Sequence, residues 1–343
     1  MSPSKWFTGT SGVNEVPAAP AVVALGGGHG LAASLSALRR VTTSLTAVVT
    51  VADDGGSSGR LRRDLGVLPP GDLRMALAAL CEDDEWGRTW SRVVQHRFTG
   101  PGDLSGHAVG NLLIVALWEL AADDPVNGLD WVGRLLKASG RVLPMSTVPL
   151  DIRATVAALP EYETGTDPVE DRATKEVHGQ AAIATAEGQI LAVSLIPDEP
   201  PACAEAVAAV DAADWVVLGP GSWFTSVLPH LLVPDLADAL RRTRAQRAVV
   251  INLEPQPGET TGFRPESHLE VLRKQDPDLR VDVVVADAAN ATDRQSLDRA
   301  AAALGAVVVY GDLRAGSDLP RHDPDALAAA FQQIMAGSSS TEN

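Results

Sequence analysis

Cysteine and aromatic residues are scarce in this chain. Its 343 residues include two cysteines, Cys81 and Cys203, and aromatic residues make up 4% of the total. Two cysteines exclude a disulfide scaffold, and their surroundings are apolar, which gives no support to a zinc site. We therefore predict two ordinary buried or half-buried thiols in a reducing cytosol.

The sequence also lacks long apolar runs and an excess of basic residues. No stretch approaches the roughly 18 to 20 consecutive apolar residues of a membrane span. The first twenty residues lack the apolar core of a signal peptide. The net charge of -16 argues against general nucleic-acid binding and against an anionic membrane surface. We predict a cytoplasmic protein, with disordered polar segments at 1–19 and 337–343.

Strand-like and helix-like segments alternate along most of the chain. Short apolar runs recur at 21–25, 45–52, 215–218, 248–253, 281–286 and 306–310. This alternation predicts an α/β domain over 20–336, with a mostly parallel sheet and helices on both faces. Residues 145–197 differ, because two strand-like runs, 181–186 and 190–196, flank Glu187-Gly188-Gln189. They predict a hairpin within a small antiparallel insertion.

A glycine-rich segment, Gly26-Gly27-Gly28-His29-Gly30, follows the first predicted strand and precedes a helix predicted over 31–40. The N-terminus of such a helix offers unpaired N–H groups to an anion. The motif is G-x-G-x-G, which alone is a weak signal. Asp53 follows about 20 residues later, where a Rossmann fold carries its ribose-binding acid. Residues 21–54 therefore predict a βαβ nucleotide-binding unit.

The second predicted strand runs into Asp53-Asp54-Gly55-Gly56-Ser57-Ser58. Glycines let the backbone approach a ligand, and serine hydroxyls and free N–H groups suit phosphate oxygens. Arg62 follows and complements phosphate charge. Asp53 and Asp54 are candidate Mg²⁺ ligands, since that ion prefers one or two carboxylates with phosphate oxygens. The alternatives are a plain surface connection and, for Asp54, a turn residue that bonds its own backbone.

A third polar segment follows the strand at 215–218 and contains Gly219, Pro220, Gly221, Ser222, Thr225 and Ser226. Ligands of open α/β sheets bind outside the carboxyl ends of the strands, so we expect both glycine loops to face one crevice.

Three further residues between the two loops are polar candidates. Asp72 is predicted to cap a helix over 73–81. A helix predicted over 105–120 places His107 and Asn111 on one face, either toward a ligand or in the core.

Together these segments resemble the gluconeogenesis-factor (YvcK-like) family, within the phospholactate transferase (CofD-like) superfamily. The resemblance covers about 22–331 and is carried by GGGHGL at 26–31, TVADDGGSSGRLR at 50–62, PPGDLR at 69–74, HRF at 96–98, DLSGHAVGN at 103–111, GPGSWFTSVLPHLLVP at 219–234, QPGET at 256–260 and RHDP at 321–324. It implies a Rossmann-like three-layer αβα fold and a cytoplasmic protein that binds nucleotide sugars such as UDP-N-acetylglucosamine. It also implies roles in gluconeogenic growth, cell shape and carbon flow into peptidoglycan precursors.

The resemblance adds Gln256, Glu259 and Phe263 to the expected ligand-binding residues. The chain departs from the family pattern at three places. His29 stands where Thr is usual, and Asn252 is followed by Leu-Glu-Pro where the family commonly has Asn-x-x-Thr. Phe263 keeps the ring of a frequent Tyr for stacking but loses its hydroxyl donor.

Three functions are compatible with these residues. The first is a non-catalytic nucleotide-sugar sensor, since none of the loop serines lies in a G-x-S-x-G elbow. The second is a Mg²⁺-dependent transferase that uses Asp53 and Asp54 on a nucleotide-activated donor. A nicotinamide-dependent enzyme ranks last, because a contact between Asp53 and a ribose does not require the Gly-Ser run that follows Asp53. The ligand's identity, a regulatory protein partner and the oligomeric state stay open.

Overall fold

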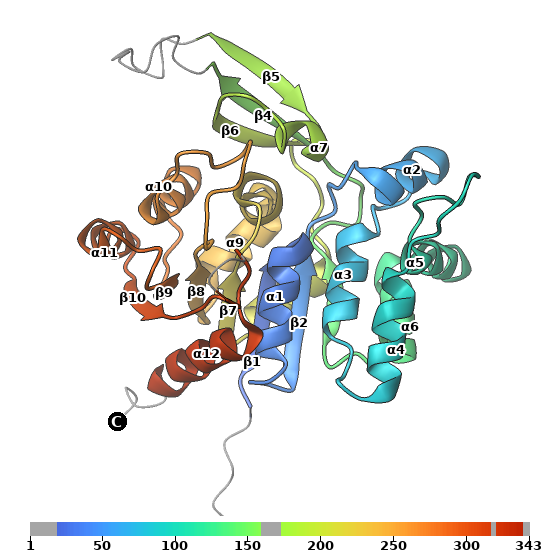
Figure 1. Cartoon of the computed structure of the whole chain (residues 1–343), viewed down its shortest axis with the longest axis horizontal. Helices are drawn as coiled ribbons and strands as arrows, with labels where there is room; N and C mark the ends of the chain where they lie inside the picture. Colours follow the sequence, from blue (N-terminus) through green and yellow to red (C-terminus); the bar gives the residue numbers. More distant parts are fainter. Residues whose placement is uncertain (1–18, 159–172, 317–319, 339–343) are drawn as a thin grey trace, which may run out of the picture.

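The computed structural model describes residues 19–158, 173–316 and 320–338. Seven strands form one parallel sheet in the order β10-β9-β8-β7-β1-β2-β3 (Figure 1). Their bounds are β1 Ala21–Gly26, β2 Ser44–Val49, β3 Arg141–Pro144, β7 Trp215–Leu218, β8 Gln246–Val250, β9 Val283–Asp287 and β10 Val307–Gly311. The expected parallel sheet is confirmed, and it extends across the whole domain.

Helices cover both faces of this sheet. On one face α1 (Gly28–Leu38) packs against α3 (Gly71–Ala79) and α12 (Pro324–Ser338), which lie in front of the sheet in Figure 1. The strand order reverses direction after β3, and right-handed crossovers then place the later helices on the opposite face. These are α8 (Ala204–Asp211), α9 (Pro234–Arg242), α10 (Pro265–Gln275) and α11 (Arg294–Ala302). The three-layer αβα prediction is therefore confirmed.

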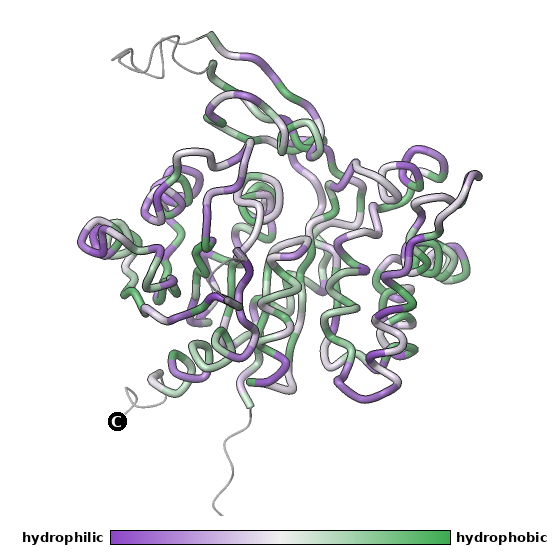
Figure 2. Tube along the Cα trace, in the orientation of Figure 1, coloured by the Kyte–Doolittle hydropathy of each residue, from purple (hydrophilic) through white to green (hydrophobic). Residues whose placement is uncertain are grey.

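Four more helices lie on the right of Figure 1, beyond α1, and of these α6 packs against β3. Their bounds are α2 Gly56–Leu65, α4 Glu85–Gln95, α5 Val109–Leu120 and α6 Pro125–Leu136. The sheet's central strands are buried on both faces, and every residue of β7 is buried. Parallel strands covered on both sides read as continuous apolar runs, as these do. Figure 2 shows hydrophobic residues gathered along α1 and the central strands, while α10 and α11 carry hydrophilic residues on the outside.

The sheet has a topological switch point between β1 and β7. From β1 the chain proceeds to β2 and β3 on one side, and β7, β8, β9 and β10 follow on the other. The loops that leave β1 and β7 therefore run side by side at the carboxyl edge. They touch at Gly30, where a Cβ atom would overlap with the main chain of Pro220 and Gly221. Only glycine permits so close an approach of two backbones.

The insertion is a three-stranded antiparallel sheet in the order β5-β4-β6, formed by β4 (Asp151–Ala157), β5 (Thr174–His178) and β6 (Gln189–Ile196). The predicted hairpin around Glu187-Gly188-Gln189 is wrong. Residues Gln180–Ile183 form a short helix, α7, and both β5 and β6 pair with β4. Gly179 has φ +91°, which ends β5, and the N–H of Ala181 donates to Asp54 Oδ1 instead of to a strand.

Two other boundaries differ from the prediction. Helix α5 begins at Val109, so His107 precedes it and does not share a helix face with Asn111. A bridge between Arg97 and Ala108 and the left-handed Gly106, at φ +77°, hold this segment extended. At the other end α12 continues to Ser338, two residues into the segment predicted to be disordered. Residues 1–18 and 339–343 lie outside the described residues.

The contact between the two glycine loops makes a direct prediction. In Gly30→Ala the new methyl group must displace the Pro220 backbone, so we expect a loss of about 1–3 kcal/mol in unfolding free energy, typical of overpacking. Gly102→Ala is the matched control, because a Cβ added there would have no atom within 4 Å and the φ of Gly102 is ordinary. Urea denaturation of both variants measures the difference. Equal stability of the two would show that the loops separate freely.

Candidate functional site

The first glycine loop is enclosed by polar side chains. Helix α1 begins at Gly28, and its N-cap Gly27 has no side chain to bond the first N–H groups. A Cβ atom on Gly27 would lie 2.6 Å from Asp72 Oδ2 and 3.2 Å from Ser226 Oγ. The Thr50 side chain meets the same position, and its buried hydroxyl has no hydrogen-bond partner among the described residues. The helix N-terminus predicted for an anion is therefore lined with unpaired polar groups.

Asp72 is a site residue that the sequence prediction misassigned. It does not cap α3, because the N-cap position is Pro70 and Asp72 lies in the first turn. Its carboxyl group is buried against the glycine loop, and its Oδ2 atom lacks a partner within the described ranges. Burial, and secondarily the charge of Asp53, raise the pKa of Asp72 to about 7. The acid is therefore poised to change protonation near neutral pH.

The predicted pair Asp53 and Asp54 faces two different ways. Asp53 Oδ1 accepts a hydrogen bond from the Gly55 N–H at 2.9 Å, and its Oδ2 lies near Gly71. It lines a cavity of about 210 Å³ together with Asp72. Asp54 Oδ1 accepts from the Ala181 N–H at 2.9 Å and so holds the insertion. Asp53 and Asp72 are thus the two acids that share the crevice.

Ser57 and Ser58 do not form an open loop, because α2 begins at Gly56 and both lie buried in its first turn. Ser57 Oγ contacts His107 Nδ1 at 2.9 Å and accepts from Asn111 Nδ2 at 3.0 Å. Asn111 Oδ1 in turn accepts from Arg74 Nε at 2.9 Å. Burial lowers the pKa of His107 and that of Arg74. These residues form the wall behind the cavity.

Arg62, predicted to meet phosphate, contacts the insertion instead. Its Nη1 donates to the Leu150 carbonyl at 2.8 Å and lies 2.9 Å from Asp151 Oδ1. Arg62 thus holds the start of β4 against α2. Asp54, which precedes α2, holds the turn at α7. The insertion is therefore attached to the same helix that carries Ser57 and Ser58.

The hydroxyl groups of the second loop are already bound to an internal carboxylate. Glu259, 5% exposed, accepts hydrogen bonds from Ser222 and Thr225 hydroxyls and, at 3.2 Å, from the Phe224 N–H. The resemblance placed Glu259 in the site, and the structure gives it this contact. Phe263 packs edge-on against Phe224, with ring centroids 6.0 Å apart.

A cavity of about 450 Å³ lies between the two loops and the segment after β8. It is lined by His29, Gly30, Pro220, Gly221, Gln256 and His322, among others. The Asn252 side chain fixes its floor, accepting from the Gly221 N–H and donating to the Gly221 carbonyl, each at 2.8 Å. A small-molecule site of this size is typical of proteins.

Two buried acceptors on this cavity lack partners among the described residues: Gln256 Oε1 and His322 Nε2. Burial lowers the pKa of His322 to about 4, so the ring is neutral at physiological pH. Its bond to the Ile251 backbone must use the other nitrogen, which leaves Nε2 as an acceptor. A ligand with N–H or O–H donors would satisfy both atoms, because unpaired buried acceptors are costly.

Metal and membrane features are limited in the described parts of the chain. No group of three or more His, Cys, Asp or Glu side chains is arranged there to hold a metal ion. In the same residues, no helix combines the length and apolar character needed to cross a membrane. Both cysteines are buried, and burial raises the pKa of each thiol to about 11.

This fold defines a doubly wound α/β protein with a cavity at its switch point, the place where such folds bind ligands. The family model of 2-phospho-L-lactate transferase CofD matches residues 22–321. A gluconeogenesis-factor relative from Mycobacterium leprae is 52% identical over 322 residues, covering 93% of this chain and 87% of the relative. The gluconeogenesis factor of Listeria innocua is 40% identical over 258 residues, 74% of this chain and 73% of the relative.

A crystal structure of protein BH3568 from Bacillus halodurans superimposes with a TM-score of 0.78 at 32% identity, covering 91% of this chain and 99% of that one. The chain therefore belongs to the CofD family and, within it, to the YvcK-like gluconeogenesis factors.

The sequence prediction missed the roles of four buried residues: Thr50, Asp72, Arg74 and His322. Each lies in a segment that carried the family resemblance, namely 50–62, 69–74 and 321–324. Those segments were therefore the signal that could have indicated these residues. The sequence did not show which way each side chain points.

Asn111 is completely buried, and we expect its truncation to cost stability. Asn111→Ala removes one hydrogen bond each from Ser57 and the buried Arg74, which keep His107 and Gln95 as partners, and we expect a loss of about 1–3 kcal/mol in unfolding free energy. Asn127→Ala is the control, because Asn127 is exposed and its side chain makes no hydrogen bond within the described chain. Urea unfolding curves of the two variants provide the comparison. A neutral Asn111→Ala would exclude it from the wall of the cavity.

The raised pKa of Asp72 predicts a pH-dependent stability. The unfolded chain releases this proton near 3.8 and the folded chain near 7, so the folded state binds more protons between these values. Stability from this group is therefore lost as pH rises from about 4 to 7. Asp72→Asn removes the titration, so its stability relative to the parent should increase across that window. A difference that stays constant with pH would contradict the assignment.

Proposed function

We propose that the protein is a cytoplasmic regulator that binds a UDP-N-acetylglucosamine-like nucleotide sugar. In this role it links carbon metabolism and gluconeogenic growth to cell-envelope synthesis and cell shape. The observation that carries the proposal is the crevice at the switch point. The N-terminus of α1, which has no side-chain cap from Gly27, lies there beside a cavity whose two buried acceptors have no partner among the described residues.

The crevice suggests how such a ligand would lie. The diphosphate would meet the N–H groups at the start of α1, beside Asp72, whose carboxyl group also accepts from the Gly28 N–H and whose raised pKa favours its neutral form. The nucleoside would occupy the cavity of about 450 Å³. There the Gln256 carboxamide could pair with the N3–H and a carbonyl of uracil, and His322 Nε2 could accept from a ribose hydroxyl. The sugar would extend toward Asp53 and its smaller cavity.

A binding role is favoured over catalysis by the state of the loop hydroxyls. Ser57 is held by His107 and Asn111, and Ser222 and Thr225 are held by Glu259. His107 and Glu259 are bases within hydrogen-bond reach of these hydroxyls, but a nucleophile also needs a free path to the substrate, and Ser57 and Thr225 are only 3% and 1% exposed. These hydroxyls instead form the frame of the crevice.

A Mg²⁺-dependent phospholactate-type transferase is the second candidate, favoured by one observation. Asp53 and Asp72 lie together beside the glycine loop, and Asp72 Oδ2 is unpaired within the described residues. They fit a bound magnesium ion better than Asp53 with Asp54, whose Oδ1 is bonded to the insertion. Such an ion would neutralise phosphate charge. The protein's own part would be to orient the donor with the glycine loop.

Thermal-shift titration tests both candidates. UDP-N-acetylglucosamine, UDP, GDP and GTP are compared with and without Mg²⁺, and a ligand at 100 times its Kd should add about 2.7 kcal/mol. The sensor proposal expects selective stabilisation by the UDP-sugar and no turnover. If no UDP-sugar binds, that proposal fails. Mg²⁺-dependent transfer of a group from a nucleotide donor to an added acceptor, with release of the nucleotide, would favour the transferase.

The nucleoside placement makes a separate prediction. Gln256→Met keeps the size of the side chain but removes its amide, and we expect at least tenfold weaker nucleotide-sugar binding, or about 1.4 kcal/mol. The control is Gln332→Met, at an exposed position of α12. Calorimetric titration of both variants gives the affinities. Equal affinities would place the base elsewhere.

A further inference from the structure

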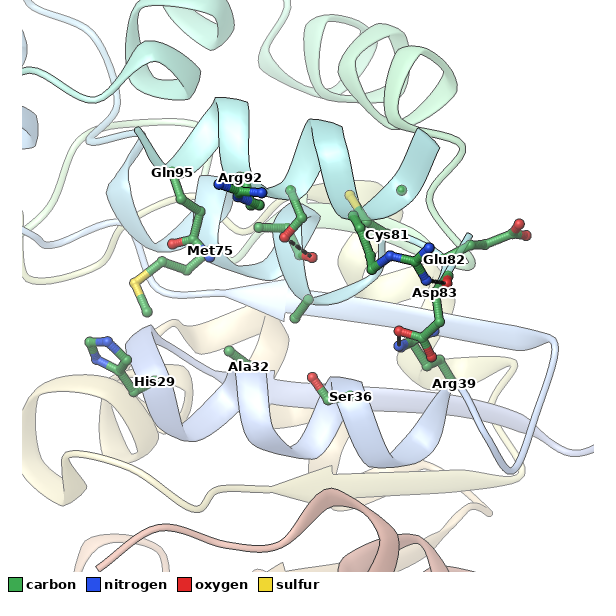
Figure 3. Close-up of a pocket in the computed structure, with 15 residues that line it drawn as sticks. His29, Ala32, Ser36, Arg39, Met75, Cys81, Glu82, Asp83, Arg92 and Gln95 are labelled. Atoms are coloured by element: carbon green, nitrogen blue, oxygen red, sulfur yellow. Dashed lines mark hydrogen bonds and ion pairs between the residues drawn. The ribbon is translucent and has the colours of Figure 1, made fainter. Parts of the chain in front are cut away.

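A second cavity, of about 480 Å³, runs along the groove between α1, α3 and α4 (Figure 3). His29, Arg92 and Gln95 lie at one end, and Arg39, Glu82 and Asp83 lie at the other. His29 also lines the nucleotide cavity, so the two cavities meet at the start of α1. Nothing in the proposed nucleotide placement uses the remainder of this groove.

Two of the charged residues at one end of the groove are paired. Arg39 pairs with Asp83 at 2.6 Å, and Arg88 donates to the Asp83 carbonyl. At the other end Arg92 is exposed and has no hydrogen bond or ion pair with any described residue, although the chain as a whole carries a net charge of -16. A free guanidinium at the wall of a cavity is suited to bind a phosphate group through paired N–H donors.

The rest of the groove fits an organic body with hydroxyl groups. Ala32 and Ala78 leave the space between the helices open. Ser36 points from α1 into the groove, and its hydroxyl bonds to no described residue (Figure 3). Glu82 lies at the far end, and its carboxylate points away from the groove (Figure 3). The volume is too large for a bare anion and lies within the range of small-molecule sites.

We propose that this groove is a second ligand site, which binds a small phosphorylated polyhydroxy compound, such as a sugar phosphate. The phosphate lies at Arg92, and the hydroxyls reach Ser36. The site is connected to the nucleotide crevice by two contacts. One is His29, and the other is Gln95, which accepts from Arg74 Nη1 at 3.2 Å. A ligand in the groove therefore touches the wall that carries Asn111 and Ser57.

Isothermal titration of the full chain tests the site, with glucose 6-phosphate, inorganic phosphate, glucose and citrate as probes. Arg92→Gln should weaken glucose 6-phosphate binding at least tenfold, whereas Arg273→Gln, an exposed arginine on α10, should leave it unchanged. Ser36→Ala should weaken glucose 6-phosphate but not inorganic phosphate. UDP-N-acetylglucosamine binding by Arg92→Gln should equal that of the parent, which separates this test from that of the nucleotide site.

Four outcomes would overturn the proposal. The first is equal binding of glucose 6-phosphate by the parent and Arg92→Gln, and the second is no saturable binding of any phosphate probe. The third is Arg92-dependent binding of citrate alone, which would make the ligand a carboxylate. The fourth is loss of both glucose 6-phosphate and UDP-N-acetylglucosamine in Arg92→Gln, which would make the groove an extension of the nucleotide site.

Discussion

The structure depends on the contact of two backbones at Gly30 and Pro220. Because no side chain separates them, the loops after β1 and β7 lie against one another, although almost 190 residues separate them in the chain. This contact fixes the start of α1 and brings Gly27 against Asp72 and Ser226. The crevice, the N-terminus of α1 and both larger cavities lie around this one junction. A side chain here would move all of them apart.

Much of the fold could be predicted from the sequence because its signals are local. Apolar β-branched runs indicated the strands, and the glycine segments after two of them indicated loops at one edge of the sheet. The hairpin prediction failed because it relied on a local signal, Glu187-Gly188-Gln189. The Ala181 N–H, which would belong to the first strand of that hairpin, donates instead to Asp54, 127 residues away. Likewise, the local pattern at Asp72 indicated a helix cap, but the glycine loop and Asp53 bury that carboxyl group. Side-chain partners distant in sequence decided these details.

Helix α2 combines two tasks. Its first turn carries Ser57 and Ser58 at the cavity, while Arg62 and the preceding Asp54 hold the antiparallel insertion. The insertion is therefore positioned by the same short segment that shapes the crevice. Displacement of the insertion would pull on Asp54, and through it on Asp53 and the start of α2. A ligand bound at the first loop would thus be linked to the sheet of β4, β5 and β6 through Asp54 and α2.

The carboxylate of Glu259 makes the two ends of the crevice electrostatically different. It occupies the hydroxyls of the second loop, so a negative charge resides there before any ligand arrives. The first loop differs, because burial raises the pKa of Asp72, the acid beside it, to about 7. In the proposed complex, a phosphate placed at the second loop would meet a carboxylate that already holds the loop hydroxyls. Glu259 would then favour one of the two orientations of an elongated ligand, and this asymmetry would come from the protein's own side chain rather than from the ligand.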